Sequence, residues 1–125
     1  MKRIKLAVLA CFALLPGIIH SQAWTTYQNF PDNHIFGVGF QNYNTKWFAT
    51  SFGGVTKYDN TGWATYDTTN GLANYYLESI MVDDSDNVYV GYGLINGISK
   101  FDGSNWSYMT TPSDVYDMTI DSSGN

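Results

Sequence analysis

The stretch LESIMVDDSDNVYVGYGLINGISKFDGSNWSYM, residues 77–109, contains short apolar runs separated by polar turn sequences. The runs hold Ile, Val, Tyr, Phe and Trp, which favour β-strands, and they cover residues 77–82, 88–92, 98–101 and 105–109. Between them, 83–87 is a polar turn of Asp, Ser and Asn, Ile95-Asn96-Gly97 is a second turn, and Asp102-Gly103 is a hairpin signal. The stretch therefore predicts four antiparallel strands that follow one another along the chain.

Parts of this stretch recur elsewhere in the sequence. Segment 46–59 matches 88–102, and segment 77–87 matches 115–125. Tryptophans spaced by 39 and 43 residues each begin a similar phrase: Trp24, Trp63 and Trp106. Three copies of one repeat are therefore visible, the first degenerate and the third incomplete.

The repeat predicts an all-β fold built of β-propeller blades. Four short antiparallel strands in about 41 residues, with recurring aromatic residues, are typical of such a blade. Residues 24–125 hold about two and a half blades at that length, whereas propellers close with about 4 to 8. The remaining blades are expected from a longer chain or, as an alternative, from homo-oligomerisation.

The repeat as a whole resembles the two-component regulator propeller repeat, which occurs in exported bacterial sensor proteins. The second copy carries the resemblance with Trp63, Gly71-Leu72, 83–87, 88–91, Gly97-Ile98 and 100–103, and the third copy with 121–125. The first copy departs from the pattern, because 41–45 replaces the acidic turn. The resemblance implies an exported sensor region that precedes a membrane span and a cytoplasmic kinase.

The N-terminus reads as an export signal. Lys2, Arg3 and Lys5 precede an apolar stretch at 6–19, and Ser21-Gln22-Ala23 fits a signal peptidase site. We therefore expect a signal peptide at 1–23 and a partial propeller at 24–125, in a periplasmic, cell-surface or secreted protein. A retained N-terminal anchor helix and a lipoprotein acylated at Cys11 stay open as alternatives.

Composition excludes several classes of function. The 125 residues are 44% hydrophobic, 17% aromatic and 14% charged. Residues 24–125 hold three Lys, no Arg, eleven acidic residues, one His and no Cys, a formal charge of −8. The mature segment therefore lacks a disulfide framework, a Cys/His zinc cluster and the positive charge for nucleic acid or anionic membranes. We expect no cofactor, no nucleic-acid partner and no membrane insertion of this segment.

No catalytic constellation stands out. His34 is the single imidazole after residue 23, and it lies in the loop sequence Pro31-Asp32-Asn33-His34. Most acidic residues occupy repeated turn positions, which favours turn formation over a single active site: Asp59, Asp102, Asp83, Asp84, Asp86 and Asp121. We predict no catalytic or metal site, while a calcium site at 83–87 and a pair of catalytic carboxylates stay open as alternatives.

Binding is the better prospect. In the geometry that the resemblance implies, loops 31–34, 70–76 and 112–114 share one face with loops 51–54 and 92–96. The ligand-binding residues that we predict on this face are His34, Phe52, Asn74, Tyr75, Tyr76, Tyr92 and Asn96. Tyrosine rings and amides suit a glycan or an extended peptide. As the alternative, Tyr75 and Tyr76 pack between blades.

The other large side chains are assigned to structure. Trp24, Trp63 and Trp106 recur with the period and are expected in the core between blades, and Trp47 and its repeat counterpart Tyr89 are likewise expected in the core. Lys57 and Lys100 are expected to face outward from equivalent strands.

We therefore predict a non-enzymatic exported propeller segment that binds a ligand or a protein partner, as in the sensor region of two-component regulators. One alternative is a secreted or cell-surface adhesion or assembly propeller with a C-terminal sorting domain. The other is a carbohydrate-active propeller enzyme.

Overall fold

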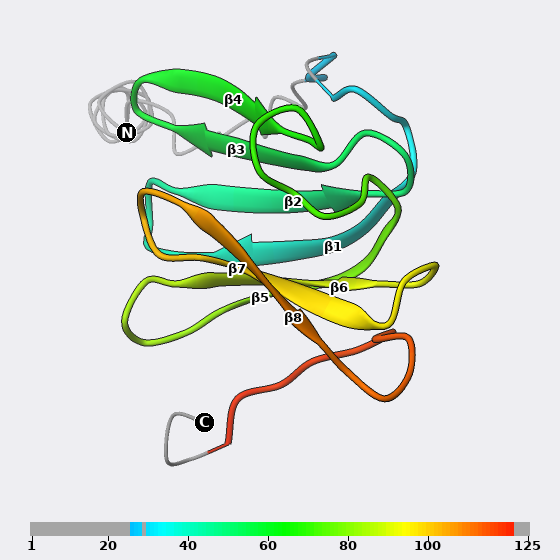
Figure 1. Ribbon diagram of the computed structural model, residues 1–125. Helices are drawn as coiled ribbons and strands as arrows, with labels where there is room; N and C mark the ends of the chain where they lie inside the picture. Colours follow the sequence, from blue (N-terminus) through cyan, green and yellow to red (C-terminus); the bar gives the residue numbers. More distant parts are fainter. Residues whose placement is uncertain (1–25, 29, 122–125) are drawn as a thin grey trace, which may run out of the picture.

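The computed structural model describes residues 26–28 and 30–121, and these residues form two four-stranded sheets (Figure 1). The first sheet contains β1 (Ile35–Phe40), β2 (Lys46–Thr50), β3 (Val55–Asp59) and β4 (Gly62–Tyr66). The second contains β5 (Leu77–Val82), β6 (Val88–Tyr92), β7 (Gly97–Phe101) and β8 (Trp106–Thr110). The predicted signal peptide, Cys11 and Trp24 lie outside the described residues.

Each sheet is an antiparallel meander in which neighbouring strands follow one another in sequence. This confirms the all-β, four-stranded blade predicted from the sequence, including the blade built by the degenerate first copy. The residues described contain no helix, and hence none that could cross a membrane.

The hydrophobic core lies between the two sheets. On the first sheet, Trp47, Ala49 and Val55 are fully or almost fully buried, and Trp47 stacks on Tyr66 at 5.6 Å between ring centroids. The second sheet covers them with buried side chains: Leu77, Val88, Val90, Tyr92 and Phe101. A fully buried Val, Leu or Phe contributes about 1.5–3 kcal/mol, so this interface is the main source of stability.

The first strands of the two sheets approach closely because β1 contains glycines where they meet. A Cβ atom on Gly37 would lie 2.8 Å from Cγ2 of Ile80, and one on Gly39 would lie 2.8 Å from Cγ2 of Val82. The missing side chains let β1 contact β5 directly.

Each sheet also has an outer face that points away from the other sheet. On the first sheet, Trp63 contacts Tyr27, Phe30, Phe48 and Tyr58 there, so it does not enter the core between the two sheets. Trp106 matches its prediction, because its ring lies 5.7 Å from that of Tyr66 in the first sheet.

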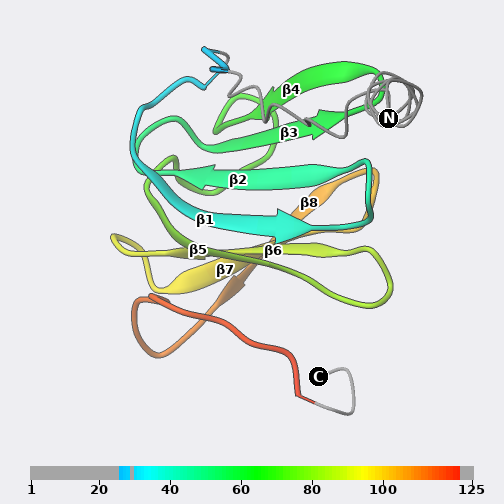
Figure 2. The same cartoon turned by 180° about the vertical axis from the view of Figure 1, so that it is seen from behind.

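A third repeat begins against the outer face of the second sheet. Residues 115–121 run beside that sheet on the side away from the first one, as Figure 2 shows in red. The Ser79 hydroxyl donates to the carbonyl of Val115 at 3.2 Å, and Met118 and Ile120 line a hollow of about 370 Å³ with Met81 and Tyr89. The described chain is thus two complete blades and the start of another.

The connections lie at two opposite edges of the sheets. The tight turns 41–45, 83–87 and 102–105 lie at one edge. The other, which we call the loop edge, collects 31–34, 51–54, 70–76, 93–96 and 111–114 (right-hand side of Figure 1). This is the arrangement that the propeller geometry predicted for the two sets of loops.

Candidate aromatic binding site at the loop edge

Four aromatic rings from separate segments meet at the loop edge. The Phe52 ring lies 5.0 Å from that of Tyr76 and 6.1 Å from that of Tyr75, and the Phe36 ring lies 6.5 Å from that of Tyr76. We call Phe36, Phe52, Tyr75 and Tyr76 the aromatic cluster. Its members come from β1, from the loop between β2 and β3, and from the connection between the sheets.

The aromatic cluster is open to solvent. Phe52 is 59% exposed, and Phe36 and Tyr75 are each 48% exposed. Rings of this size are usually buried, and several exposed in mutual contact mark a surface that binds something apolar or flat. Tyr75 and Tyr76 contact Phe52 at the surface, and neither is among the buried core residues.

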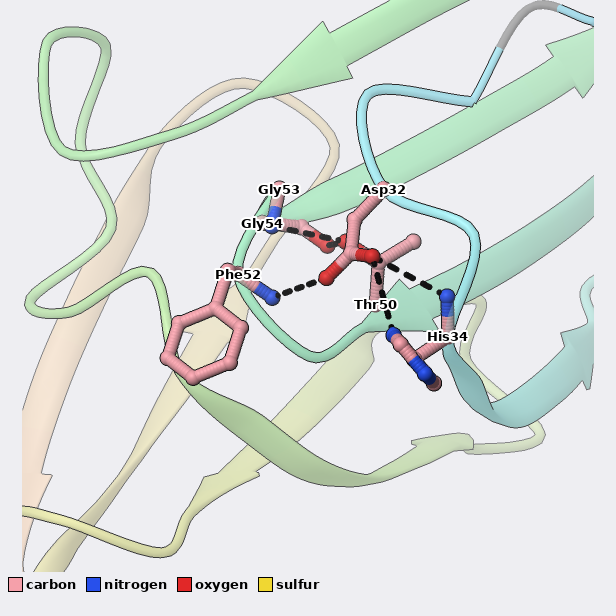
Figure 3. A network of polar contacts seen from close by, with 6 residues as sticks. All are labelled: Asp32, His34, Thr50, Phe52, Gly53 and Gly54. Atoms are coloured by element: carbon pink, nitrogen blue, oxygen red, sulfur yellow. Dashed lines mark hydrogen bonds and ion pairs between the residues drawn. The ribbon is translucent and has the colours of Figure 1, made fainter.

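Asp32 fixes the position of Phe52 (Figure 3). Its Oδ2 accepts the backbone N–H of Phe52 at 2.7 Å, and its Oδ1 accepts that of His34 at 3.1 Å. The His34 hydrogen bond and, after it, that of Phe52 hold the pKa of Asp32 below its usual value against partial desolvation. One ionised carboxylate therefore ties loop 31–34 to loop 51–54.

The loop that carries Phe52 is further constrained by Thr50 and two glycines (Figure 3). The Thr50 hydroxyl donates to the Gly54 carbonyl at 2.9 Å and accepts the Gly53 N–H at 3.1 Å. Gly54 has φ of 75°, and a Cβ atom on Gly53 would lie 2.5 Å from Cγ of Pro31. The loop is therefore pre-organised and presents Phe52 in one orientation.

Tyr76 is held by its neighbours in sequence and by Glu78. The Asn74 side chain accepts the Tyr76 N–H at 2.9 Å, so Asn74 shapes the loop and is half-buried. The Tyr76 hydroxyl is hydrogen-bonded to Glu78, which raises the pKa of Tyr76. Glu78 itself stays half-exposed at the loop edge.

Not every residue predicted for ligand binding is available there. Tyr92 is fully buried, because its hydroxyl reaches inward to Ser99 Oγ at 2.7 Å and accepts the Ala73 N–H at 3.1 Å. Its apolar ring and satisfied hydroxyl make it a core residue, which corrects the prediction. Asn96 is exposed, and its carbonyl accepts the Tyr108 hydroxyl, so it braces the outer part of the second sheet.

The sequence analysis missed Phe36 and Glu78. They occupy equivalent positions in the first strands of the two blades, and each lies at a shift of strand register, between Ile35 and Gly37 and between Leu77 and Ser79. Such β-bulges leave one residue unpaired and redirect its side chain. The equivalence of Phe36 and Glu78 follows from their places in the two sheets, and the sequence gives no sign of the bulge.

His34 and Asp32 form a pair without catalytic surroundings. Their side chains are 3.3 Å apart and the His34 side chain is 80% exposed. In the part of the chain that the structure describes, no hydroxyl group is hydrogen-bonded to the His34 ring. The pair therefore lacks the buried nucleophile and base geometry of a hydrolase.

The acidic turn 83–87 uses its carboxylate internally. Asp83 accepts the N–H groups of Ser85 and Asn87 through Oδ1, and the side chains of Asn87 and Tyr89 through Oδ2. Among residues 26–28 and 30–121 no group of His, Cys, Asp or Glu side chains is arranged to hold a metal ion. The geometry favours turn formation over calcium binding.

The lysines are paired away from the loop edge. Lys57 binds Asp59 at 2.6 Å and lies 5.7 Å from the centroid of the Trp47 ring. Lys100 lies 5.4 Å from the Tyr89 ring centroid in the second sheet. Both lysines are half-buried, so they cover the strand aromatics rather than extend freely into solvent.

Comparisons with known proteins show the same fold. No family model and no curated protein matches the sequence. Solved structures do match, among them two crystal structures from B. thetaiotaomicron. One is described as the extracellular domain of a hybrid two-component system; it has a TM-score of 0.56 and 23% identity over 80% of this chain and 12% of that one.

The other is described as the extracellular domain of a one-component system, with a TM-score of 0.57 and 24% identity over 80% of this chain and 13% of that one. The matched part of this chain thus spans about an eighth of the length of these structures. At this identity the likeness confirms the blade fold. The two-component description of the first neighbour is the kind of protein in which the repeat that this sequence resembles occurs.

Proposed function

We propose that this protein is the recognition segment of an exported, non-enzymatic β-propeller sensor, and that it binds a glycan or peptide ligand at the loop edge. The observation that carries the proposal is the aromatic cluster: solvent-exposed rings from three separate segments in mutual contact. Flat apolar ring faces of this kind cover the C–H surface of a sugar or the side chains of an extended peptide.

Pre-organisation supports the proposal. Phe52 sits in a loop fixed by Asp32, Thr50 and Gly54, so that little conformational entropy is lost when a ligand covers its ring. A purely structural aromatic residue would instead turn into the core, as Trp47 does at 1% exposure.

The extracellular placement of the solved neighbours supports export, in agreement with the signal peptide predicted at 1–23. Because those structures are about six to seven times as long as this chain, further blades that complete a ring and a downstream signalling region are part of the proposal. The loop edge of the described blades would then border the central channel of that ring.

Glycan and peptide arrays probed with the purified protein would test the proposal. We expect binding to one ligand class, and we expect Phe52→Ala to weaken it about tenfold or more, because truncating a central aromatic contact removes a large share of binding energy. Tyr43→Ala is the matched control: Tyr43 is 93% exposed in turn 41–45, at the opposite edge. Equal loss in both variants, or no ligand on either array, would contradict the proposal.

A further inference from the structure

The two β-bulges bring an aromatic ring and a carboxylate to the same place. Phe36 and Glu78 are the unpaired residues of β1 and β5, and both contact Tyr76, Phe36 through its ring at 6.5 Å and Glu78 through a hydrogen bond. A Cβ atom on Gly93 would lie 2.5 Å from Cγ of Glu78, so the loop between β6 and β7 also meets this carboxylate. The aromatic cluster therefore has an acidic group at its border.

Further negative charge lies beside Glu78. Asp114 is within 3.3 Å of the Tyr116 hydroxyl. The charge of Asp114 and its hydrogen bond, with a smaller contribution from Glu78, raise the pKa of Tyr116. Glu78 acts on both Tyr76 and Tyr116, which places the two tyrosines and the two acids in one electrostatic neighbourhood.

No cation of the described residues balances these charges. Lys57 is paired with Asp59, Lys100 covers Tyr89, and Lys46 donates to the carbonyl of Tyr43 at 3.1 Å. Lys46 begins β2 and Lys100 lies near the end of β7, so both are towards the edge of tight turns. Within residues 26–28 and 30–121, neither Glu78 nor Asp114 has an ion-pair partner.

We propose that the ligand of the loop edge is an extended basic peptide, whose lysine or arginine side chain lies against the aromatic cluster with its charge directed to Glu78. The inference rests on the proposed function and narrows its ligand class. A cation is attracted both by the faces of Phe and Tyr rings and by a carboxylate, and its alkyl stem covers apolar ring surface. A neutral oligosaccharide would use the rings but would leave the acidic border without a partner.

Binding of hexalysine to the purified full chain, compared with the same peptide acetylated on every side chain and with cellohexaose, would test the inference. We expect hexalysine to bind at least about tenfold more tightly than the acetylated peptide, because acetylation removes the charge and keeps the stem. Glu78→Gln should weaken hexalysine binding about fivefold, whereas Asp84→Asn should change it less than about twofold. Asp84 is the matched control, an exposed acid in turn 83–87 at the opposite edge.

The outcomes separate this inference from the proposed function. If cellohexaose binds, Phe52→Ala abolishes its binding and hexalysine is ignored, the loop edge is a recognition site but the basic ligand is wrong. If hexalysine binding falls equally in Glu78→Gln and Asp84→Asn and is unchanged in Phe52→Ala, the attraction is general surface charge and the inference fails. The acetylated-peptide arm uses the unmodified protein, so the test does not depend on how a variant folds.

Discussion

In the second blade one carboxylate holds the turn between the first two strands, whereas in the first blade two amides share the same contacts. Asp83 accepts two backbone N–H groups and also the hydroxyl of Tyr89. At the equivalent turn, Asn42 accepts the N–H groups of Asn44 and Thr45, and Gln41 accepts the Trp47 indole N–H at 2.9 Å. The turn thus requires acceptors at two places, towards the backbone and towards the strand aromatic, and it does not require a charge.

The blades differ in a second buried pair. In the second blade the Tyr92 hydroxyl meets Ser99 Oγ, whereas the equivalent residues of the first blade are Thr50 and Thr56. Thr50 turns its hydroxyl to the Gly54 carbonyl, and the Thr56 hydroxyl is buried without a hydrogen-bond partner in the described structure. In the first blade Thr50 therefore holds the loop after β2 that presents Phe52, and the hydroxyl of Thr56 behind it is left unsatisfied.

The largest effect is expected where the strand aromatics of the two blades are exchanged for alanine. Trp47→Ala should lower the free energy of unfolding by about 3–5 kcal/mol, because Trp47 is buried against Tyr66 and Phe101. Tyr89→Ala, on the half-buried outer face, should cost about 1–2 kcal/mol. Urea unfolding followed by Trp fluorescence would measure the free energy of unfolding of both variants. Equal losses of stability would show that Trp47 and Tyr89 do not differ in burial as described.

The buried hydroxyls should respond in opposite ways. Ser99→Ala removes one of the two partners of the buried Tyr92 hydroxyl and should cost about 1–2 kcal/mol. Thr56→Val replaces an unsatisfied hydroxyl by a methyl group of the same shape and should be neutral or stabilising by up to about 1 kcal/mol. Chemical denaturation of both variants would decide, and a clear loss in Thr56→Val would reveal a partner for that hydroxyl.

The smallest expected difference is in acid. Partial burial raises the pKa of Asp83, but the hydrogen bonds from Asn87, Tyr89 and Ser85 outweigh it, so the pKa lies below its ordinary value of 3.8. The ionised carboxylate therefore stabilises the fold above that value, and this contribution is lost as the pH falls from about 4 through the lower pKa of the folded state.

Asp83→Asn should lower stability at pH 7 by about 1 kcal/mol and flatten its decline in acid. Denaturation midpoints between pH 7 and pH 3 would measure this. Gln41→Glu is the matched comparison, because it places a carboxylate at the equivalent turn of the first blade. The Gln41 amide that it replaces does not titrate in the native protein. An unchanged acid profile in Asp83→Asn would place the acid sensitivity elsewhere.

The fold was predictable because the same pattern of strands and turns occurs more than once in the sequence. Apolar runs of strand length, polar turns and recurring tryptophans specified the blades, and the resemblance to the propeller repeat implied the edge at which the loops gather. The site was only partly predictable. Phe52, Tyr75 and Tyr76 come together as expected, but Tyr92 is buried, because its hydroxyl binds Ser99 on the next strand and Ala73 in the connection between the sheets. The positions of the Phe36 and Glu78 side chains are set by β-bulges, and no residue type in the sequence predicts these bulges.

The bulge has a consequence for how such proteins diversify. Phe36, Glu78 and, by the sequence repeat, Tyr116 are three copies of one position, each near the loop edge while the core residues of the blade pack elsewhere. An aromatic, an acid and a phenol already occupy it in a single chain. With the proposed function, duplication of a blade would add one contact residue outside the packed core, and ligand preference would then change one blade at a time.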